Sequence, residues 1–465
     1  MTVDDAGARA LPPVPPPPPP RAAPGSGGPG RARQDAVYRA GALGRRPRVP
    51  TDPAGLERAA RRRMSRDAWA YVAGGAGSGA TMRANRAALD AWAIVPRVLR
   101  DVTARDLSVE LFGHRYPAPV LVGPVGAAAL VAPDADLAIA RAAASVGLPY
   151  VFSNQGCAPM EQTAAAMGDG PRWFQLYWSK DEELVDSFLG RAERAGAQAV
   201  VVTLDTTLLG WRPMDLDRGL LPFVRGLGLA QYTSDPRFRE LVRERLARSE
   251  QPGRPLRVTP GAVRTLLAMS RAYPGSTWAN LRSREPRAAV ETFLDAYSNP
   301  ALSWDHVATL RERTRLPVVL KGVLHPDDAR RAFDLGVDGV VVSNHGGRQV
   351  DGAVAAAEAL PRVREAVGAD RTVLLDSGIR SGADVVKALA LGADAVLLGR
   401  PSVYGLAVAG EDGVREVLEN VVAELDLTAG LAGVTNWDDG AELLLHACFS
   451  PGRRVNVAYR PVSNQ

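Results

Sequence analysis

Residues 317–343 read PVVLKGVLHPDDARRAFDLGVDGVVVS, and this stretch decides the fold. The apolar runs Pro317–Lys321 and Gly339–Ser343 are typical of short strands buried on both faces, whereas Pro326–Leu335 between them has helical spacing. Six residues of the unit recur 56 positions later, where Asp328, Ala332, Leu335, Gly336, Asp338 and Val340 return as Asp384, Ala388, Leu391, Gly392, Asp394 and Val396. The repeat predicts strand–helix units whose helices end at the glycines.

Eight such apolar runs occur along the chain, and most are separated by segments of helical spacing. The runs are Pro119–Gly123, Pro149–Ser153, Trp173–Tyr177, Ala199–Thr203, Pro317–Lys321, Gly339–Ser343, Val373–Ser377 and Ala395–Gly399. The helical segments include Ala135–Val146, Glu182–Ala195 and Ala383–Leu391. Eight buried strands alternating with helices predict a (β/α)8 TIM barrel in the α/β class.

One interval breaks this rhythm, because 113 residues separate Thr203 from Pro317. Within it the pattern predicts three helices, near Asp235–Arg248, Pro260–Ala272 and Pro286–Tyr297. We therefore expect a long helical insertion after the fourth strand, at about 213–300, that acts as a lid or as an oligomer contact.

The first 34 residues contain the unbroken proline run Pro15–Pro20 and cannot build a core. We expect residues 1–34 to form a disordered tail and residues 35–465 to form the barrel domain. The alternative is that the tail docks into an aromatic groove of a partner protein.

The composition excludes several classes of protein. The net charge is +5, from 56 basic and 51 acidic residues that are scattered rather than clustered, so nucleic-acid binding is not expected. No apolar run is long enough for a membrane span, and no N-terminal signal for secretion is evident, so a cytoplasmic location is expected. The only cysteines, Cys157 and Cys448, give neither a disulfide framework nor a metal-binding spacing.

In a TIM barrel the chemistry collects where the strands end, and the loops after strands seven and eight commonly bind phosphate. Asp376-Ser377-Gly378-Ile379-Arg380 follows the seventh run, and Gly399-Arg400 follows the eighth. Glycines allow backbone amides to approach a phosphate, and arginines can clamp it. The alternative is that these are ordinary turn glycines and solvated arginines.

Among the five histidines, only His345 lies at the end of a predicted strand, which makes it the candidate general base. Asp205, just beyond the fourth strand, is placed to hold the imidazole and stabilise its protonated form. Arg212 and Arg348 offer two guanidinium forks for a small carboxylate. Lys321 is one of only three lysines in the chain and ends an apolar strand, which indicates a charge aimed at a ligand anion. These features are typical of the oxidation of a small acid through a flavin, although spacing alone does not name the flavin.

Residues 35 to about 440 resemble the FMN-dependent α-hydroxy acid oxidases and dehydrogenases. The motifs that carry the resemblance are Tyr71-Val72-Ala73-Gly74-Gly75-Ala76 with Asn85 and Pro96-Arg97, Phe174-Gln175-Leu176-Tyr177, Thr203-Leu204-Asp205-Thr206, Leu320-Lys321-Gly322, Ser343 to Gln349, Asp376 to Arg380, and Gly399-Arg400-Pro401.

The resemblance implies FMN as the cofactor, a small 2-hydroxy acid and O2 as substrates, and a homotetramer or homo-octamer. It implies that His345 is the base, supported by Asp205, that Arg212 and Arg348 hold the substrate carboxylate, and that Tyr71 and Tyr177 hydrogen-bond to the substrate. It also implies a set of FMN-binding residues, which are Val125, Ser153, Gln175, Thr203, Lys321, Ser343, Asp376, Gly378, Arg380, Gly399 and Arg400.

Within the family the chain is most similar to members that convert L-lactate to acetate, because of Gly210-Trp211-Arg212-Pro213-Met214-Asp215, Ala230-Gln231-Tyr232 and the long insertion. The alternatives are an oxidase that releases the 2-oxo acid with hydrogen peroxide, a dehydrogenase that uses another electron acceptor, and a catalytically idle flavoprotein. Asn154-Gln155 depart from the family pattern of serine followed by an aromatic residue, which leaves the preferred 2-hydroxy acid open.

Overall fold

In the computed structural model of the chain, residues 27–248, 259–437 and 445–447 are described. Eight parallel strands close into a barrel in chain order, with β11 pairing back to β4. The barrel strands are β4 (Val120–Val122), β5 (Tyr150–Phe152), β6 (Arg172–Leu176), β7 (Val200–Thr203), β8 (Val318–Val323), β9 (Gly339–Val342), β10 (Thr372–Leu375) and β11 (Ala395–Leu398). Each coincides with a predicted run to within two residues at either end, and the (β/α)8 prediction is confirmed.

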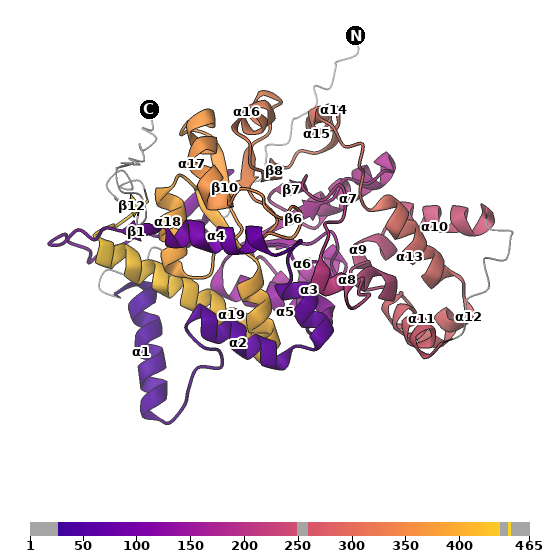
Figure 1. The fold of residues 1–465 in the computed structure, drawn as a ribbon, viewed down its shortest axis with the longest axis horizontal. Helices are drawn as coiled ribbons and strands as arrows, with labels where there is room; N and C mark the ends of the chain where they lie inside the picture. The colour runs from indigo at the N-terminus through magenta and orange to yellow at the C-terminus, as the bar shows by residue number, and fades with distance from the viewer. Residues whose placement is uncertain (1–26, 249–258, 438–444, 448–465) are drawn as a thin grey trace, which may run out of the picture.

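Helices cover the outside of the barrel (Figure 1). They are α5 (Ala135–Val146), α6 (Met160–Met167), α7 (Glu182–Arg194), α16 (Pro326–Asp334), α17 (Ala356–Val367), α18 (Gly382–Ala390) and α19 (Arg400–Ala432), with the short η1 (Ala128–Leu130) after β4. Gly336 and Gly392 follow α16 and α18 with φ of 81° and 107°, the left-handed conformation that ends a helix. The predicted glycine caps are therefore confirmed.

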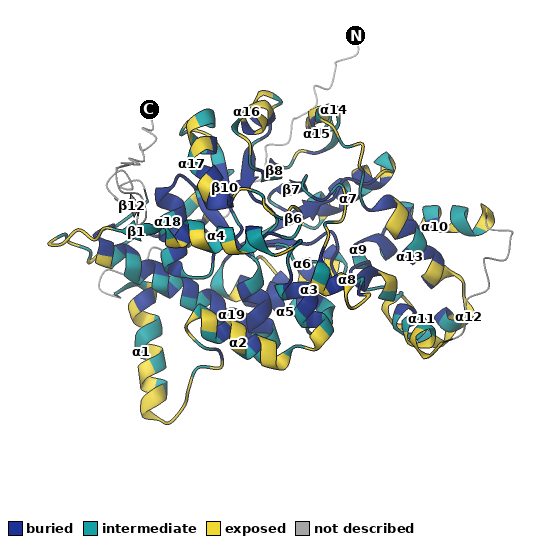
Figure 2. Ribbon diagram, viewed as in Figure 1, coloured by how far each residue is buried: buried dark blue, intermediate teal, exposed yellow. Residues whose placement is uncertain are grey.

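Alternate residues of each strand face opposite layers, as the two-residue period of a strand requires. Leu121, Val151, Trp173, Val319 and Leu374 belong to the cluster that fills the barrel interior. Their sequence neighbours pack outward against the helices in a much larger cluster. Figure 2 shows the same division, with the strands buried and the exposed residues on the outer helix faces.

A small hairpin fills the amino-terminal end of the barrel. It consists of β2 (Val109–Leu111) and β3 (His114–Tyr116), and Leu111 and Tyr116 join the interior cluster. The Trp173 indole donates a hydrogen bond to the Tyr116 hydroxyl at 3.1 Å. With this end packed, the carboxyl ends of the strands are left for a binding site.

The N-terminal segment places four helices and a strand before the barrel, and α3 supplies residues to the site described below. These elements are α1 (Gly28–Ala42), α2 (Pro53–Arg63), α3 (Arg66–Ala73), α4 (Ala80–Asp90) and β1 (Trp92–Ile94), the last pairing with β12 (Leu445–Ala447).

The predicted tail boundary at residue 34 is wrong, because α1 begins at Gly28 with Pro29 in its first turn. Contacts with residues far away in the sequence hold the start of this helix in place. The Gly30 amide donates to the Asp426 carboxylate at 3.0 Å, and Arg105 pairs with the same carboxylate. Pro15–Pro20 and Cys448 lie outside the described residues.

The insertion extends to one side of the barrel (Figure 1). Its elements up to β8 are α8 (Pro213–Leu216), η2 (Pro222–Arg225), α9 (Ala230–Thr233), α10 (Pro236–Arg248), α11 (Pro260–Ala272), α12 (Thr277–Arg282), α13 (Glu285–Ala296), α14 (Trp304–Ala308) and α15 (Leu310–Arg313). The three predicted helices are α10, α11 and α13, which confirms the helical character of the insertion. A buried aromatic cluster within it consists of Tyr232, Phe238 and Phe293. The ring centroid of Tyr232 lies 5.4 Å from that of Phe238 and 4.8 Å from that of Phe293. In the described part of the chain, no helix is both long and apolar enough to cross a membrane.

Candidate active site

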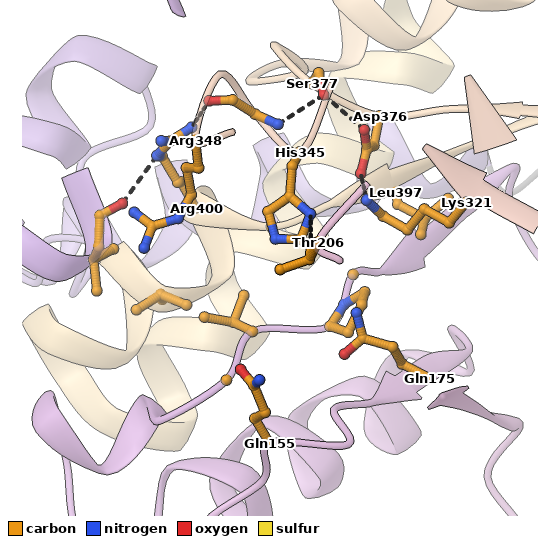
Figure 3. A pocket seen from close by; sticks show the side chains of 18 of the residues that line it. Gln155, Gln175, Thr206, Lys321, His345, Arg348, Asp376, Ser377, Leu397 and Arg400 are labelled. Carbon is orange, nitrogen blue, oxygen red and sulfur yellow. Dashed lines mark hydrogen bonds and ion pairs between the residues drawn. The ribbon is translucent and has the colours of Figure 1, made fainter. Parts of the chain in front are cut away.

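A cavity opens at the carboxyl ends of the barrel strands. Residues that follow several different strands line it together, as expected for this architecture. Of the predicted site residues, its walls include Tyr71, Val125, Gln175, Tyr177, Arg212, Lys321, His345, Arg348, Asp376, Gly378, Arg380, Gly399 and Arg400. Figure 3 shows His345, Lys321, Arg348 and Arg400 converging on this space.

His345 and Asp205 form a hydrogen-bonded pair beside the cavity. The Nδ1 atom of His345 lies 2.8 Å from Oδ1 of Asp205 and is assigned as the donor of the hydrogen bond. In the neutral imidazole the other ring nitrogen, Nε2, therefore carries no proton and can accept one. The Thr206 hydroxyl donates to the same carboxylate oxygen at 3.0 Å and lies 3.3 Å from Nδ1. Asp205 does not itself line the cavity, but it fixes the orientation of a residue that does.

The pKa values of this pair are set by burial and by charge. Burial lowers the pKa of His345 below its usual value, although the Asp205 carboxylate opposes this effect. Burial would raise the pKa of Asp205, but the charges of His345 and Lys321 outweigh it and lower that pKa to about 2. At neutral pH the pair is therefore a neutral imidazole and a carboxylate, which is the state a general base requires.

Arg212 and Arg348 place two positive charges in the same wall. The Arg212 side chain donates to the Arg348 carbonyl oxygen at 3.0 Å and to Oε1 of Gln349 at 2.7 Å. The Arg348 guanidinium donates to the carbonyl oxygens of Tyr71 and Gly74. Burial lowers the pKa of Arg348, and the neighbouring charge of Arg212 lowers it further. Among the described residues neither guanidinium forms an ion pair with a carboxylate, which favours a bound anion such as a substrate carboxylate.

Tyr71 and Tyr177 line the cavity close to these arginines. Arg348 lies over the Tyr71 ring, 5.0 Å from its centroid. Burial raises the pKa of both phenols, to about 12 for Tyr177. Both side chains therefore keep their protons at neutral pH and are available as hydrogen-bond donors.

Lys321 reaches the cavity from the end of β8. Its Nζ donates to the Ser343 hydroxyl at 2.9 Å and pairs with the Asp376 carboxylate at 3.0 Å. Burial would lower the pKa of Lys321, but the Asp376 and Asp205 carboxylates outweigh burial and raise it. The lysine is therefore a fixed positive charge that the fold orients through Ser343 and Asp376.

Hydrogen bonds with two neighbouring side chains orient the amide of Gln175. Its amide donates to the Thr203 hydroxyl at 2.9 Å and accepts from the Ser153 hydroxyl at 3.2 Å. Ser153, Thr203 and Ser343 are buried behind the wall, so among the predicted cofactor residues these three support lining groups rather than line the cavity.

Part of the cavity wall suits a phosphate. Arg380 and Arg400 both line it, and burial lowers the pKa of Arg380, with the Arg400 charge adding to the effect. Gly399 precedes the first residue of α19 and makes no side-chain cap, and a Cβ placed on it would meet nothing within 4 Å. A helix N-terminus with open space and two arginines is a favourable anion site.

These features fit the FMN expected from the sequence. Arg380, Arg400 and the Gly399 backbone offer donors for a phosphate, and Lys321 and the oriented Gln175 amide line the same cavity and suit the polar edge of a ring system. Gly378, with φ of 118°, allows a tight turn of the backbone in the cavity wall.

Three residues around the cavity hold a left-handed backbone although they are not glycines. Ala127 after β4, His345 after β9 and Ser377 after β10 have φ of 52°, 57° and 71°. The Ser377 hydroxyl accepts hydrogen bonds from the amides of Asn344 and Gly346, at 3.2 and 2.9 Å, which fixes the loop that carries His345. Such conformations persist only when surrounding contacts impose them.

The cavity also contains residues that sequence reasoning did not place there. Phe223 and Tyr297 come from the insertion, whereas Leu209 and Thr206 come from the loop after β7. The insertion therefore does reach the site, as a lid would. Phe223 and Tyr297 have no local signature, since only the packing of the insertion brings them to the barrel. Thr206 could have been predicted, because it directly follows Asp205 just beyond the end of a predicted strand.

The profile of the FMN-dependent dehydrogenase family matches residues 60–446. The FMN-dependent alpha-hydroxy acid dehydrogenase qulF of Penicillium citrinum is 43% identical over 402 residues, which cover 86% of this chain and 92% of that protein. An L-lactate oxidase of Lysinibacillus sphaericus is 39% identical over 383 residues, covering 82% and 89%. The 4-hydroxymandelate oxidase of Amycolatopsis orientalis is 39% identical over 380 residues, covering 82% and 94%.

Solved structures show the same relationship. The crystal structure of mandelate oxidase with (S)-4-hydroxymandelic acid superposes with a TM-score of 0.69 at 37% identity, covering 86% of this chain and 99% of that one.

Proposed function

Because this chain belongs to the FMN-dependent dehydrogenase family and is an FMN-dependent α-hydroxy acid oxidoreductase, we propose that it acts on a small L-2-hydroxy acid as an L-lactate 2-monooxygenase. The proposed reaction converts L-lactate and O2 into acetate, CO2 and water. The observation that carries the proposal is that His345, which is held by Asp205, lines one cavity together with Arg212, Arg348 and residues of the insertion.

In this proposal the two arginines bind the substrate carboxylate. Arg212 is oriented by Gln349 and Arg348 by two backbone carbonyls, so both guanidiniums are fixed before the substrate arrives. The protonated phenols of Tyr71 and Tyr177 donate hydrogen bonds to the remaining substrate oxygens. The α-carbon is then held near Nε2 of His345.

His345 takes a proton from the substrate, either from the α-carbon or from the hydroxyl group, and Asp205 stabilises the imidazolium that results. Bound FMN supplies the acceptor for the two electrons. Ser153, Gln175, Thr203, Lys321, Ser343 and Val125 are the residues proposed to contact its ring and ribityl chain. Asp376, Gly378, Arg380, Gly399 and Arg400 are proposed to hold its ribityl and phosphate groups.

The fate of the 2-oxo acid decides between a monooxygenase and an oxidase. Phe223 and Tyr297 from the insertion line the cavity and are 3% and 9% exposed, which supports retention of the 2-oxo acid until it is decarboxylated. The second candidate, an oxidase that releases the 2-oxo acid and hydrogen peroxide, is favoured by the names of the relatives, which include an L-lactate oxidase.

The test is the ratio of hydrogen peroxide formed to O2 consumed when FMN-loaded protein turns over L-lactate in air. A ratio near zero with acetate as product is expected, whereas a ratio near one would establish the oxidase. Negligible O2 uptake with rapid anaerobic bleaching of the FMN would instead establish a dehydrogenase that uses another acceptor.

We further propose a homotetramer or homo-octamer located in the cytoplasm. Light scattering of the purified protein measures the first property, and fractionation of the source cells measures the second.

A further inference from the structure

Two hydrogen-bonding groups converge on a single oxygen of Asp205. Its Oδ1 atom lies 2.8 Å from Nδ1 of His345 and 3.0 Å from the Thr206 hydroxyl, and this hydroxyl lies 3.3 Å from Nδ1. In the described part of the chain, the Thr206 hydroxyl has no other hydrogen-bond partner. Figure 3 shows Thr206 beside the His345 ring, joined to it by a dashed line. The proposed base therefore shares its carboxylate oxygen with a second donor.

The direction of the Thr206 hydrogen bond follows from the proton on Nδ1. When Nδ1 of His345 carries a proton, as the proposed base requires, the single hydroxyl proton of Thr206 has only Oδ1 of Asp205 to point to. The same holds after His345 is protonated, because both ring nitrogens of an imidazolium are donors. Thr206 thus donates to Asp205 in both protonation states of His345.

The second carboxylate oxygen of Asp205 is not used. Its Oδ2 atom is buried and accepts no hydrogen bond from any described residue. Gly322 in β8 leaves the space for it, since a Cβ at that position would lie 3.0 Å from Oδ2. All the side-chain hydrogen bonds that orient this carboxylate among the described residues therefore end on Oδ1, and Thr206 supplies the one that does not come from His345.

A hydrogen bond to a carboxylate stabilises its charge and makes it a weaker partner for a neighbouring cation. Burial would raise the pKa of Asp205, but the charges of His345 and Lys321, with hydrogen bonds from His345 and Thr206, lower it to about 2. Burial lowers the pKa of His345, and the Asp205 carboxylate opposes this effect. Because Thr206 weakens that carboxylate as a partner, it favours the neutral imidazole.

Three further titratable groups face the pair from other elements. Lys321 in β8 and Arg212 before α8 both disfavour the protonated imidazole through their charges. Tyr177, directly after β6, keeps its proton, since burial and the Asp205 charge raise the pKa of its phenol to about 12. Thr206 hydrogen-bonds to none of the three. A change at Thr206 therefore reaches His345 through Asp205.

We propose that Thr206 is a positioning residue that holds the Asp205 carboxylate by Oδ1 and weakens its attraction for the protonated imidazole of His345. This inference rests on the proposed function and deepens it, because it names a residue that tunes the base of that reaction. The neutral imidazole then persists to lower pH than Asp205 alone would allow.

Thr206→Val removes the hydroxyl and keeps the shape of the side chain. The test measures how the second-order rate constant for anaerobic bleaching of bound FMN by L-lactate depends on pH. We expect the acidic limb to move to higher pH by about 0.5–1 unit in this variant. Thr206→Ser, which keeps the hydroxyl, should retain the wild-type limb. Thr163→Val is the matched control, because Thr163 is a buried threonine of α6 whose hydroxyl donates to the Pro159 carbonyl oxygen at 3.1 Å.

A double variant shows whether Thr206 acts through Asp205. Asp205→Asn alone should move the acidic limb to lower pH, because the carboxylate that raises the pKa of His345 is lost. Adding Thr206→Val to Asp205→Asn should then move the limb by less than about 0.3 unit, since the charge through which Thr206 acts is absent.

The proposal is overturned if Thr206→Val leaves the limb in place, if Thr206→Ser moves it as far, or if the full shift persists in the Asp205→Asn background. The pKa of His345 is also measurable without turnover, which keeps a failure of the proposed function distinguishable. Diethyl pyrocarbonate modifies the neutral imidazole, so the pH dependence of carbethoxylation of the His345 peptide, followed by mass spectrometry, reports this pKa in FMN-loaded protein. The same upward shift in Thr206→Val is expected there, even if L-lactate never bleaches the FMN.

Discussion

The side-chain amide of Gln349 accepts a hydrogen bond from the Arg212 guanidinium at 2.7 Å. The other end of the same amide donates to the Asp205 carbonyl oxygen at 2.7 Å and to the Leu208 carbonyl oxygen at 2.8 Å. One side chain from the loop after β9 thus fixes both the proposed carboxylate-binding arginine and the backbone of the proposed catalytic aspartate.

Gln349→Leu should therefore act mainly on substrate binding. The variant leaves a buried Arg212 N–H without its acceptor, a loss of about 1–3 kcal/mol. We expect KM for L-lactate to rise about tenfold or more and kcat to fall less. Gln198→Leu is the control, because Gln198 accepts a hydrogen bond from Tyr116 at the opposite end of the barrel. An unchanged KM in Gln349→Leu would contradict the positioning role.

His345→Ala should give a yellow protein in which substrate no longer bleaches the FMN under anaerobic conditions. The imidazole is the proposed base and is not needed to retain the cofactor. Stopped-flow absorbance measures the effect, and rapid bleaching in the variant would rule out His345 as the base.

The pH dependence of kcat/KM should follow the ionisation of His345. Because the neutral imidazole is the base, activity falls as the pH drops through a pKa that burial places below the usual value. The Asp205 carboxylate raises that pKa, so Asp205→Asn should move the acidic limb to lower pH and reduce the maximal rate by about 10²–10⁴-fold. A limb that moves to higher pH in Asp205→Asn would contradict this assignment.

Lys321→Met should make the bound FMN harder to reduce. A fixed positive charge beside an electron acceptor favours the reduced form, and the variant also leaves Asp376 without its ion-pair partner. A loss of about 2–4 kcal/mol corresponds to a midpoint potential lower by roughly 40–90 mV for a two-electron couple. Lys387→Met is the control, since Lys387 lies on α18 and donates to the Leu89 carbonyl oxygen. Equal potentials in both variants would refute the role of Lys321.

Arg380→Ala should weaken FMN binding by about 10–100-fold, because a buried guanidinium is lost from the proposed phosphate site. The dissociation constant is measured from the fluorescence of released FMN. Arg362→Ala, at an exposed position on α17, should bind FMN like the wild-type protein. If the two variants bind FMN equally, the phosphate lies elsewhere.

The barrel was predictable because its strands are buried on both faces, so each reads as a short apolar run regardless of its neighbours. Pro317–Lys321 and Gly339–Ser343 needed no tertiary information to be recognised. The helical start at Gly28 was not predictable, since it depends on a hydrogen bond between Gly30 and Asp426, 396 residues apart in sequence. Local composition at residues 28–34 contains no sign of that contact.

The candidate site, too, contains some residues that could be predicted from the sequence and others that could not. His345, Lys321 and Arg400 were placed by topology alone, because parallel strands bring their carboxyl ends together. Phe223 and Tyr297 were missed because an aromatic cluster within the insertion decides where they lie. The burial of Ser153 and Thr203 behind the wall also follows from packing, which the order of residues does not reveal.

The left-handed backbone at Ala127, His345 and Ser377 limits how this site can be transferred by engineering. None of these residues favours that conformation, so the loops keep their shape through contacts with the rest of the barrel. Grafting the three loops onto another barrel would carry over their sequence but let the backbone relax, and the imidazole would leave its alignment with Asp205. A transplant that preserves the chemistry has to include the strands and the Ser377 hydrogen bonds together with the loops.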